Sequence, residues 1–166
     1  MIALLVAATL SLMDPTFADS AQEYYAQQNA DALEELLHRA DTRFEDLLGR
    51  YRLYPLTEDK ELLDDLPDDL EDGSARELAL LSGLWGYRAS RASIFSAIRY
   101  GQRSERLLDQ ARTRDPDDPY VLLVEGQSLI FKPAIAGRDK EAALQRFNRL
   151  CDVLQSAAPD TGVSMT

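Results

Sequence analysis

The residues best suited to chemistry in this sequence are five arginines of one segment, namely Arg88, Arg91, Arg99, Arg103 and Arg106. The last three are separated by four and three residues, which places their guanidinium groups on one face of a helix. Guanidinium groups form bidentate pairs with carboxylates and phosphates. Two interpretations follow. The arginines pair with acidic residues of the N-terminal half of the chain, or they form a patch for an anionic ligand or a partner segment.

Few other residues could act as a nucleophile, a base or a metal ligand, because the chain has one His, one Cys and one Trp. His38 stands away from the apolar stripe of its segment and has no Ser or Cys context typical of a catalytic triad, so we expect it at the surface. Cys151 falls on an apolar stripe and is expected to be a buried structural thiol. No phosphate loop or dinucleotide fingerprint occurs in the sequence. We therefore expect no enzymatic activity, no catalytic residue and no cofactor.

The acidic residues are concentrated in the first half of the chain. Residues 1–72 carry a balance of −13 and residues 73–166 a balance of +2, within a net charge of −11. Such a chain is unsuited to binding nucleic acid through phosphates. The densest run, 58–72, is interpreted as a solvated connector. It also resembles a calcium loop, but Leu70 and Ala79 occupy two positions that need oxygen ligands, so we expect no metal site.

The N-terminal segment indicates export. Residues 2–13 are apolar and uncharged, too few to span a bilayer but enough for the core of a signal peptide. Thr16 and Ala18 supply the small residues for cleavage after Ala18. We therefore predict a signal peptide over 1–18 and a periplasmic or secreted protein, with no membrane span elsewhere. The alternative is an apolar first helix docked on the core, since the positively charged region of a signal peptide is missing.

Beyond this segment the apolar residues recur at steps of three and four, and no stretch alternates with a period of two. This predicts one all-α domain over 19–160, followed by a flexible tail over 161–166. Asp139 is expected to cap the N-terminus of the last helix. The helices are expected near residues 20–28, 30–40, 42–55, 58–65, 75–91, 97–114, 119–131 and 139–156.

The helical pattern repeats along the chain. At an offset of 43 residues, Gly83 matches Gly126 and Pro116 matches Pro159, and at an offset of 34, Gly49 matches Gly83. A glycine within a helix costs about 1 kcal/mol relative to alanine. Each of these glycines is therefore expected at the close approach of a neighbouring helix. The matches indicate helix pairs of one design that stack on each other.

Leu48-Gly49, and the segment from Gly83 to Ala111 and Pro116, resemble the tetratricopeptide repeat. The resemblance covers about residues 42–159, with two units nine residues longer than the 34-residue period of the family. It implies stacked antiparallel helix pairs, a tetratricopeptide-like α-solenoid with two to three degenerate repeats. From Gly126 to Phe147 the last unit is similar to the helical-repeat component of some periplasmic solute transport systems, although Arg138 replaces a glycine of its turn.

In the tetratricopeptide family the first helix of each pair lines a concave face, and this resemblance implies the binding residues of the present chain. They are Arg50, Tyr54, Leu84, Tyr87, Arg88 and Gln127, with Leu53 and Ile130 beside them. The alternative is that several of them are buried between repeats. The hypothesis for function is a non-catalytic scaffold that binds a protein or peptide in the cell envelope, with self-association possible. The alternative is a small-ligand receptor or an accessory subunit of a periplasmic transport system.

Overall fold

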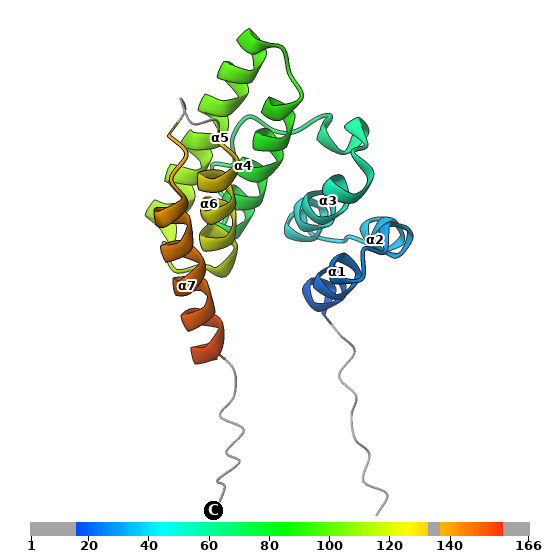
Figure 1. Ribbon diagram of the computed structural model, residues 1–166. Coiled ribbons are helices and arrows are strands. Elements are labelled where there is room, and N and C mark those ends of the chain that lie inside the picture. The colour runs from blue at the N-terminus through cyan, green and yellow to red at the C-terminus, as the bar shows by residue number, and fades with distance from the viewer. Residues whose placement is uncertain (1–15, 133–136, 158–166) are drawn as a thin grey trace, which may run out of the picture.

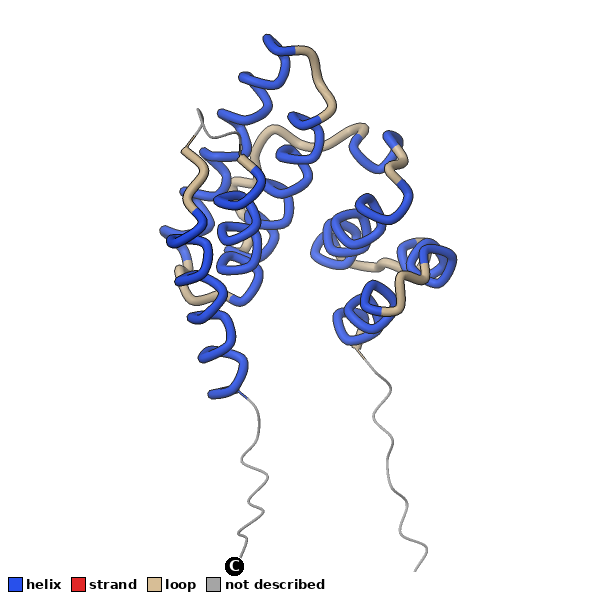
Figure 2. The backbone as a smooth tube through the Cα atoms, viewed as in Figure 1, coloured by secondary structure: helices blue, strands red, loops and turns tan. Residues whose placement is uncertain are grey.

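The computed structural model describes residues 16–132 and 137–157, and these form helices with no strand among them (Figures 1 and 2). The all-α expectation is confirmed. The proposed signal-peptide core, Pro159 and the tail lie outside the described residues, and the expected cleavage point after Ala18 falls within the first helix. The elements are α1 (Phe17–Ala26), α2 (Ala30–Leu37), α3 (Arg43–Thr57), the 3₁₀ turn η1 (Lys60–Leu63), α4 (Ala75–Ser90), α5 (Ile94–Arg114), α6 (Pro119–Phe131) and α7 (Lys140–Ala157).

Local capping explains where most of the helices begin. Thr16, Thr42 and Ser74 each accept a backbone hydrogen bond from the acidic residue three positions later, and that acid's side chain accepts one from the cap backbone. This reciprocal arrangement satisfies two free N–H groups at a helix start. Asp118 accepts from Tyr120 N at 2.9 Å at the start of α6. The Asp139 carboxylate accepts from Glu141 N and Ala142 N, which confirms its expected role as a cap.

The acidic connector between α3 and α4 differs from the expectation. The helix expected over 58–65 is only the short 3₁₀ turn η1, because Glu58 adopts a left-handed conformation (φ 54°) that ends α3. The connector is also more than a solvated segment. Three of its side chains are buried in the core, namely Leu63, Leu66 and Leu70. Trp85 Nε1 of α4 donates to Pro67 O at 3.0 Å and fixes the connector to the core.

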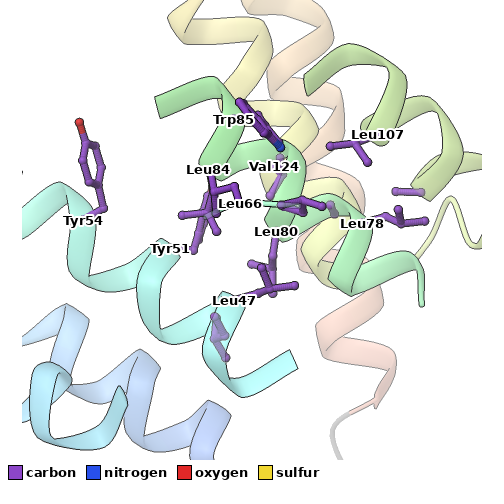
Figure 3. Close-up of a cluster of buried hydrophobic side chains, with 14 of the residues drawn as sticks. Leu47, Tyr51, Tyr54, Leu66, Leu78, Leu80, Leu84, Trp85, Leu107 and Val124 are labelled. Atoms are coloured by element: carbon purple, nitrogen blue, oxygen red, sulfur yellow. The ribbon is translucent and has the colours of Figure 1, made fainter. Parts of the chain in front are cut away.

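Helix α4 lies at the centre of the fold and packs against α3, α5, α6 and η1. Its consecutive residues Leu78, Ala79, Leu80 and Leu81 are all fully buried, although consecutive residues of a helix point in different directions. Leu78 and Leu80 are drawn in Figure 3. A helix that is apolar on all sides requires neighbours on all sides. Helices α4 and α5 form one antiparallel pair and α6 and α7 a second, while α1 and α2 pack on α3 on the other side of α4 (Figure 1).

The three repeated glycines do lie at close approaches, as expected, but each meets a different kind of neighbour. A Cβ at Gly49 would lie 2.7 Å from Leu37 Cδ1 of α2, and one at Gly126 would lie 2.7 Å from the Phe147 ring of α7. At Gly83 it would overlap the Tyr51 ring of α3. Within the α4–α5 pair the helices are joined instead by Ser82 of α4 and Ser104 of α5. The hydroxyl of each serine donates a hydrogen bond to the backbone carbonyl of the other.

The last helix departs from a sequence expectation. Cys151, expected to be buried, is exposed on α7. Helix α7 packs only on α6, so just one of its faces is covered. Leu144 and Leu154 are also exposed, by 60% and 53%. The spacing of apolar residues shows that α7 has a wide apolar stripe. It does not show which part of that stripe is covered by α6, the one helix that packs on it.

Replacing Gly83 by alanine tests the close approach of α3 to α4. The added methyl group overlaps the Tyr51 ring, and overpacking of this kind costs about 1–3 kcal/mol of stability. In the Gly101→Ala control the new methyl group has open space, so helix propensity adds up to about 1 kcal/mol. Urea unfolding should therefore show opposite signs for the two variants. Stabilisation by both would contradict the close approach.

An ion pair joins the start of α3 to the start of α4. Arg43 Nε donates to Glu77 Oε1 at 2.9 Å, and Arg43 Nη1 to Asp72 Oδ1 at 3.0 Å. Burial raises the pKa of the Glu77 carboxyl, but hydrogen bonds from Arg43 and Ser74 outweigh it and hold the pKa at about 2. The Glu77 side chain is 13% exposed, so this pair is better shielded than a surface ion pair.

The depressed pKa of Glu77 predicts a pH-dependent stability. Its contribution is complete above the ordinary pKa of 4.5 and is lost as the pH falls towards 2. At pH 7 we expect Glu77→Gln to lower the free energy of unfolding by about 2 kcal/mol, after allowance for screening at the half-exposed Arg43. The difference from the wild type should shrink as the pH falls through this window. Glu35→Gln, at an exposed position of α2, is the control, and an unchanged deficit near pH 2 would contradict the assignment.

Candidate functional site

The five arginines singled out in the sequence divide into two groups. Three of them bind the acidic connector: Arg91 pairs with Glu58, Arg103 pairs with Asp68, and Arg106 donates to Asp68 O at 3.4 Å. Arg91 and Arg103 follow the first interpretation, pairing with acids of the N-terminal half, while Arg106 bonds only to a backbone carbonyl of the connector.

The other two arginines rest on aromatic rings. The Arg88 guanidinium lies 5.1 Å from the centroid of Trp85 and 5.2 Å from that of Tyr100, and the Arg99 guanidinium lies 5.3 Å from Tyr100. Neither makes an ion pair with any residue that the structure describes. Cation–π contact holds a guanidinium in place without neutralising it. The charges of Arg88 and Arg99 are therefore not offset by a carboxylate among the described residues.

These residues lie in a stretch that is free of acid. Between Glu77 and Glu105 the sequence has four arginines and no Asp or Glu. The stretch folds into most of α4, the loop after it and the first half of α5, and the loop forms one end of the α4–α5 pair (Figure 1). The acidic connector packs beside this stretch, and its Glu58 and Asp68 pair with Arg91 and Arg103. Among the described residues, the arginines of the stretch left without an acid are therefore Arg88 and Arg99.

An open pocket of about 340 Å³ lies at this end of the molecule, which we call the end pocket. It is formed where the ends of α3 and α4 meet η1 and the start of α5. Three cations and one carboxylate are among its lining residues. The lining is Tyr54, Lys60, Leu63, Asp64, Arg88, Arg91, Ala92, Ser93, Ser96 and Tyr100. A hollow of about 370 Å³ elsewhere is lined by side chains of α5 alone and encloses no site.

Tyr54 is the most buried polar side chain of the end pocket. It is 4% exposed, and its ring stacks on Tyr87 with a centroid distance of 4.9 Å. Its hydroxyl is buried and has no hydrogen-bond partner among the described residues. In Figure 3 the ring stands apart from the other labelled core side chains and the hydroxyl points away from them. A buried hydroxyl without a partner costs free energy, so its position calls for a reason.

The start of α5 also presents donors to the end pocket. Ser93, the residue before the helix, makes no side-chain capping bond, and the first turn carries no acid. In the three capping boxes elsewhere in the chain, a carboxylate stands three residues after the cap, where α5 has Ser96. Helix α5 is 21 residues long, and its first backbone N–H groups carry partial positive charge. The sequence signal for this feature is the missing Ser-x-x-Glu pattern at 93–96.

A second group of polar and aromatic side chains, the inner face, gathers around Arg52 of α3. Arg52 Nη2 donates to Gln22 Oε1 at 2.7 Å, and its guanidinium lies 4.9 Å from the Tyr25 centroid, both on α1. Tyr51 Oη of α3 donates to Gln127 Oε1 of α6. We define the inner face by Gln22, Tyr25, Arg52, Tyr120 and Gln127, which are all partly or fully accessible.

The pKa values of the tyrosines reflect the same arrangement. Burial raises the pKa of Tyr87 to about 12 and also raises that of Tyr120, while the positive charge of Arg52 opposes both changes. Tyr51 has a raised pKa for the same reason, and its ring stacks on Tyr87 with a centroid distance of 5.3 Å. These tyrosines are therefore neutral hydrogen-bonding and packing groups at physiological pH.

The structure separates the six binding residues implied by the resemblance. Gln127 lies on the inner face, and Tyr54 and Arg88 line the end pocket. Tyr87 lies between them and stacks on both Tyr51 and Tyr54. They do not form one continuous surface.

The remaining two have structural contacts. Arg50 pairs with Asp46 at 3.0 Å and donates to Asp64 O at 3.3 Å, and Leu84 is fully buried. For Leu84 and Tyr54 the alternative of burial between helices is the one observed. Sequence reasoning missed Arg52, Tyr25 and Tyr120, because their meeting depends on how three separate helices pack.

His38 is exposed on the end of α2, as expected. Across the described parts of the chain, no three His, Cys, Asp or Glu residues are grouped so that they could hold a metal ion. Within the same parts, every helix is too short or too polar to cross a membrane.

Replacing Tyr54 by phenylalanine tests whether its hydroxyl serves the fold. Because the hydroxyl is buried without a partner, its removal should raise the free energy of unfolding by about 1 kcal/mol. The matched variant is Tyr51→Phe, which removes the hydrogen bond to Gln127 and should lower it by about 1 kcal/mol. Thermal and urea unfolding measure both. Equal destabilisation by the two variants would show that Tyr54 has a structural partner.

Comparisons with models of known families, with curated proteins and with solved structures found no match to this chain. The interpretation of its function therefore rests on the chemistry and geometry of the inner face and the end pocket.

Proposed function

We propose that the protein is a non-catalytic, tetratricopeptide-like helical-repeat scaffold whose inner face binds a segment of another protein. The pairing of α4 with α5 and of α6 with α7, and the packing of α4 on both α3 and α6, support the repeat arrangement. In this arrangement α1, α3 and α6, which carry the inner face, are the helices that face the partner. The apolar segment 2–13 supports the cell envelope as its location.

The observation that carries this proposal is that α1 and α6 both bring polar side chains to α3 around Arg52. Gln22 and Tyr25 of α1 contact Arg52 itself. Gln127 of α6 accepts from the adjacent Tyr51, and the charge of Arg52 acts on Tyr120. Tyrosine and arginine provide large, rigid contact areas with polar ends, and they dominate the binding energy of protein interfaces. Here the Tyr25 ring and the Gln22 amide already hold the Arg52 side chain in place. A partner segment then loses less entropy on binding than it would to a free arginine.

A non-catalytic role fits the placement of the two most reactive side chains. His38 ends α2 and Cys151 lies on α7, and these two helices make no contact. Among the residues that the structure describes, no side chain contacts either of them in a way that would activate it for nucleophilic chemistry.

Site-specific crosslinking tests the inner face. A photoreactive residue placed at Tyr120 or Gln22 should capture one defined partner from the native envelope. The same residue at Gln145, exposed on α7, should not. Arg52→Ala should reduce the capture by at least about tenfold, the typical effect of losing a hot-spot arginine. Equal capture from Tyr120 and Gln145, or capture unchanged by Arg52→Ala, would overturn the proposal.

The second candidate function is a small-ligand receptor. The end pocket favours it, because its volume of about 340 Å³ is at the lower end of the range of ligand sites.

A further inference from the structure

We propose that the end pocket is an oxyanion site that binds a phosphate group through Tyr54, Arg88 and the start of α5. The inference rests on the second candidate function and is independent of the inner face. Three donors of different kinds reach this pocket: a buried hydroxyl, an unpaired guanidinium and the N-terminus of a long helix.

The charge of the pocket favours an anion. Lys60, Arg88 and Arg91 line it, against one carboxylate, Asp64. Arg91 is neutralised in part by its pair with Glu58, but Arg88 and Lys60 have no acidic partner among the described residues. Arg88 also rests on two adjacent rings, those of Trp85 and Tyr100, which hold it in position. It is therefore a fixed positive charge that lacks a counterion.

The orphaned hydroxyl of Tyr54 supplies an observation independent of charge. A tyrosine that is 4% exposed normally has a partner for its hydroxyl. Among the residues described, Tyr54 Oη makes no hydrogen bond of good geometry, and the charge that neighbours it is that of Arg91, whose guanidinium is already paired with Glu58. An O–H group that donates to an anionic oxygen forms one of the shorter and stronger hydrogen bonds in proteins. A bound oxyanion would provide the partner that the fold does not.

The start of α5 supplies the third donor. Its first-turn N–H groups are not taken up by a capping side chain, and Ser93 and Ser96 add hydroxyl groups beside them. A helix N-terminus binds phosphate through these N–H groups and the helix dipole together. Because the donors come from α3, α4 and α5, they surround the pocket from several directions. Donors placed in several directions match the tetrahedrally arranged oxygens of a phosphate group better than the two coplanar oxygens of a carboxylate.

The phosphate group could belong to a soluble phosphate ester or to the headgroup of an anionic lipid. The rim of the pocket distinguishes the two sources. Ile94, Phe95 and Ile98 of α5 are exposed by 78%, 88% and 56% and directly follow or flank the lining serines. A lipid surface would use these apolar side chains, whereas a soluble ester would not need them.

Titration with phenyl phosphate, followed by amide chemical shifts in NMR, tests the site. We expect saturable binding, with shifts concentrated at residues 93–97 and 88–91. Tyr54→Phe and Arg88→Gln should each weaken binding by at least about tenfold, because each removes a donor to a charged oxygen. Arg39→Gln removes the same charge from an exposed position remote from the pocket and should leave the affinity unchanged. Tyr54→Phe is the sharpest test, since we expect it to stay folded and yet lose binding.

Vesicles identify the source of the phosphate group. Sedimentation with phosphatidic acid in phosphatidylcholine is compared with pure phosphatidylcholine. If the ligand is a lipid headgroup, Phe95→Ser should abolish vesicle binding and leave phenyl phosphate binding intact. If the ligand is a soluble ester, only phenyl phosphate should bind. Either result supports the oxyanion site.

Two results would overturn it: no saturable binding of phenyl phosphate or of vesicles, or binding to which Tyr54→Phe and Arg88→Gln make no difference. Because the crosslinking positions lie outside the end pocket, this failure would leave the inner-face proposal standing.

Discussion

The close approach of Tyr51 to Gly83 is the contact on which the rest of the arrangement depends. Only a residue without a side chain lets the tyrosine ring of α3 lie directly on the backbone of α4. The same ring stacks on Tyr87, and its hydroxyl reaches Gln127 on α6. One aromatic side chain therefore sets the spacing of three helices, and with it the position of Arg52 beside it on α3. About one turn further along α3, Tyr54 lies at the end pocket.

The acidic connector has a structural role that its charge conceals. Its buried leucines cover one side of α4, and its carboxylates bind Arg91 and Arg103. This pairing neutralises part of the arginine-rich hairpin and leaves Arg88 without an acid. Because η1 is a single turn rather than a full helix, the connector leaves a space beside the ends of α3 and α4. The helix expected over 58–65 would occupy this space, which instead forms part of the end pocket.

Local features of the sequence predict most of the helices, and non-local features decide the sites. Capping residues such as Asp139 and the three-and-four spacing of leucines act within a few residues, so they can be read directly. The burial of Leu84 and the exposure of Cys151 depend on which neighbour covers each face, and sequence periodicity contains no information on that. The end pocket joins Tyr54, Lys60, Arg88 and Ser93, which lie up to 39 residues apart. The arginine spacing identified a basic segment, but not which arginine would remain unpaired.

The end pocket concentrates features that weaken a fold. An unpartnered buried hydroxyl, an uncapped helix and a guanidinium without a counterion each carry a cost in stability, and each could be relieved by a single substitution. Elsewhere in the described chain three helices have complete capping boxes, and Arg91 and Arg103 have acids of the connector. Features that cost stability and occur together in one pocket are typical of a site shaped for a ligand.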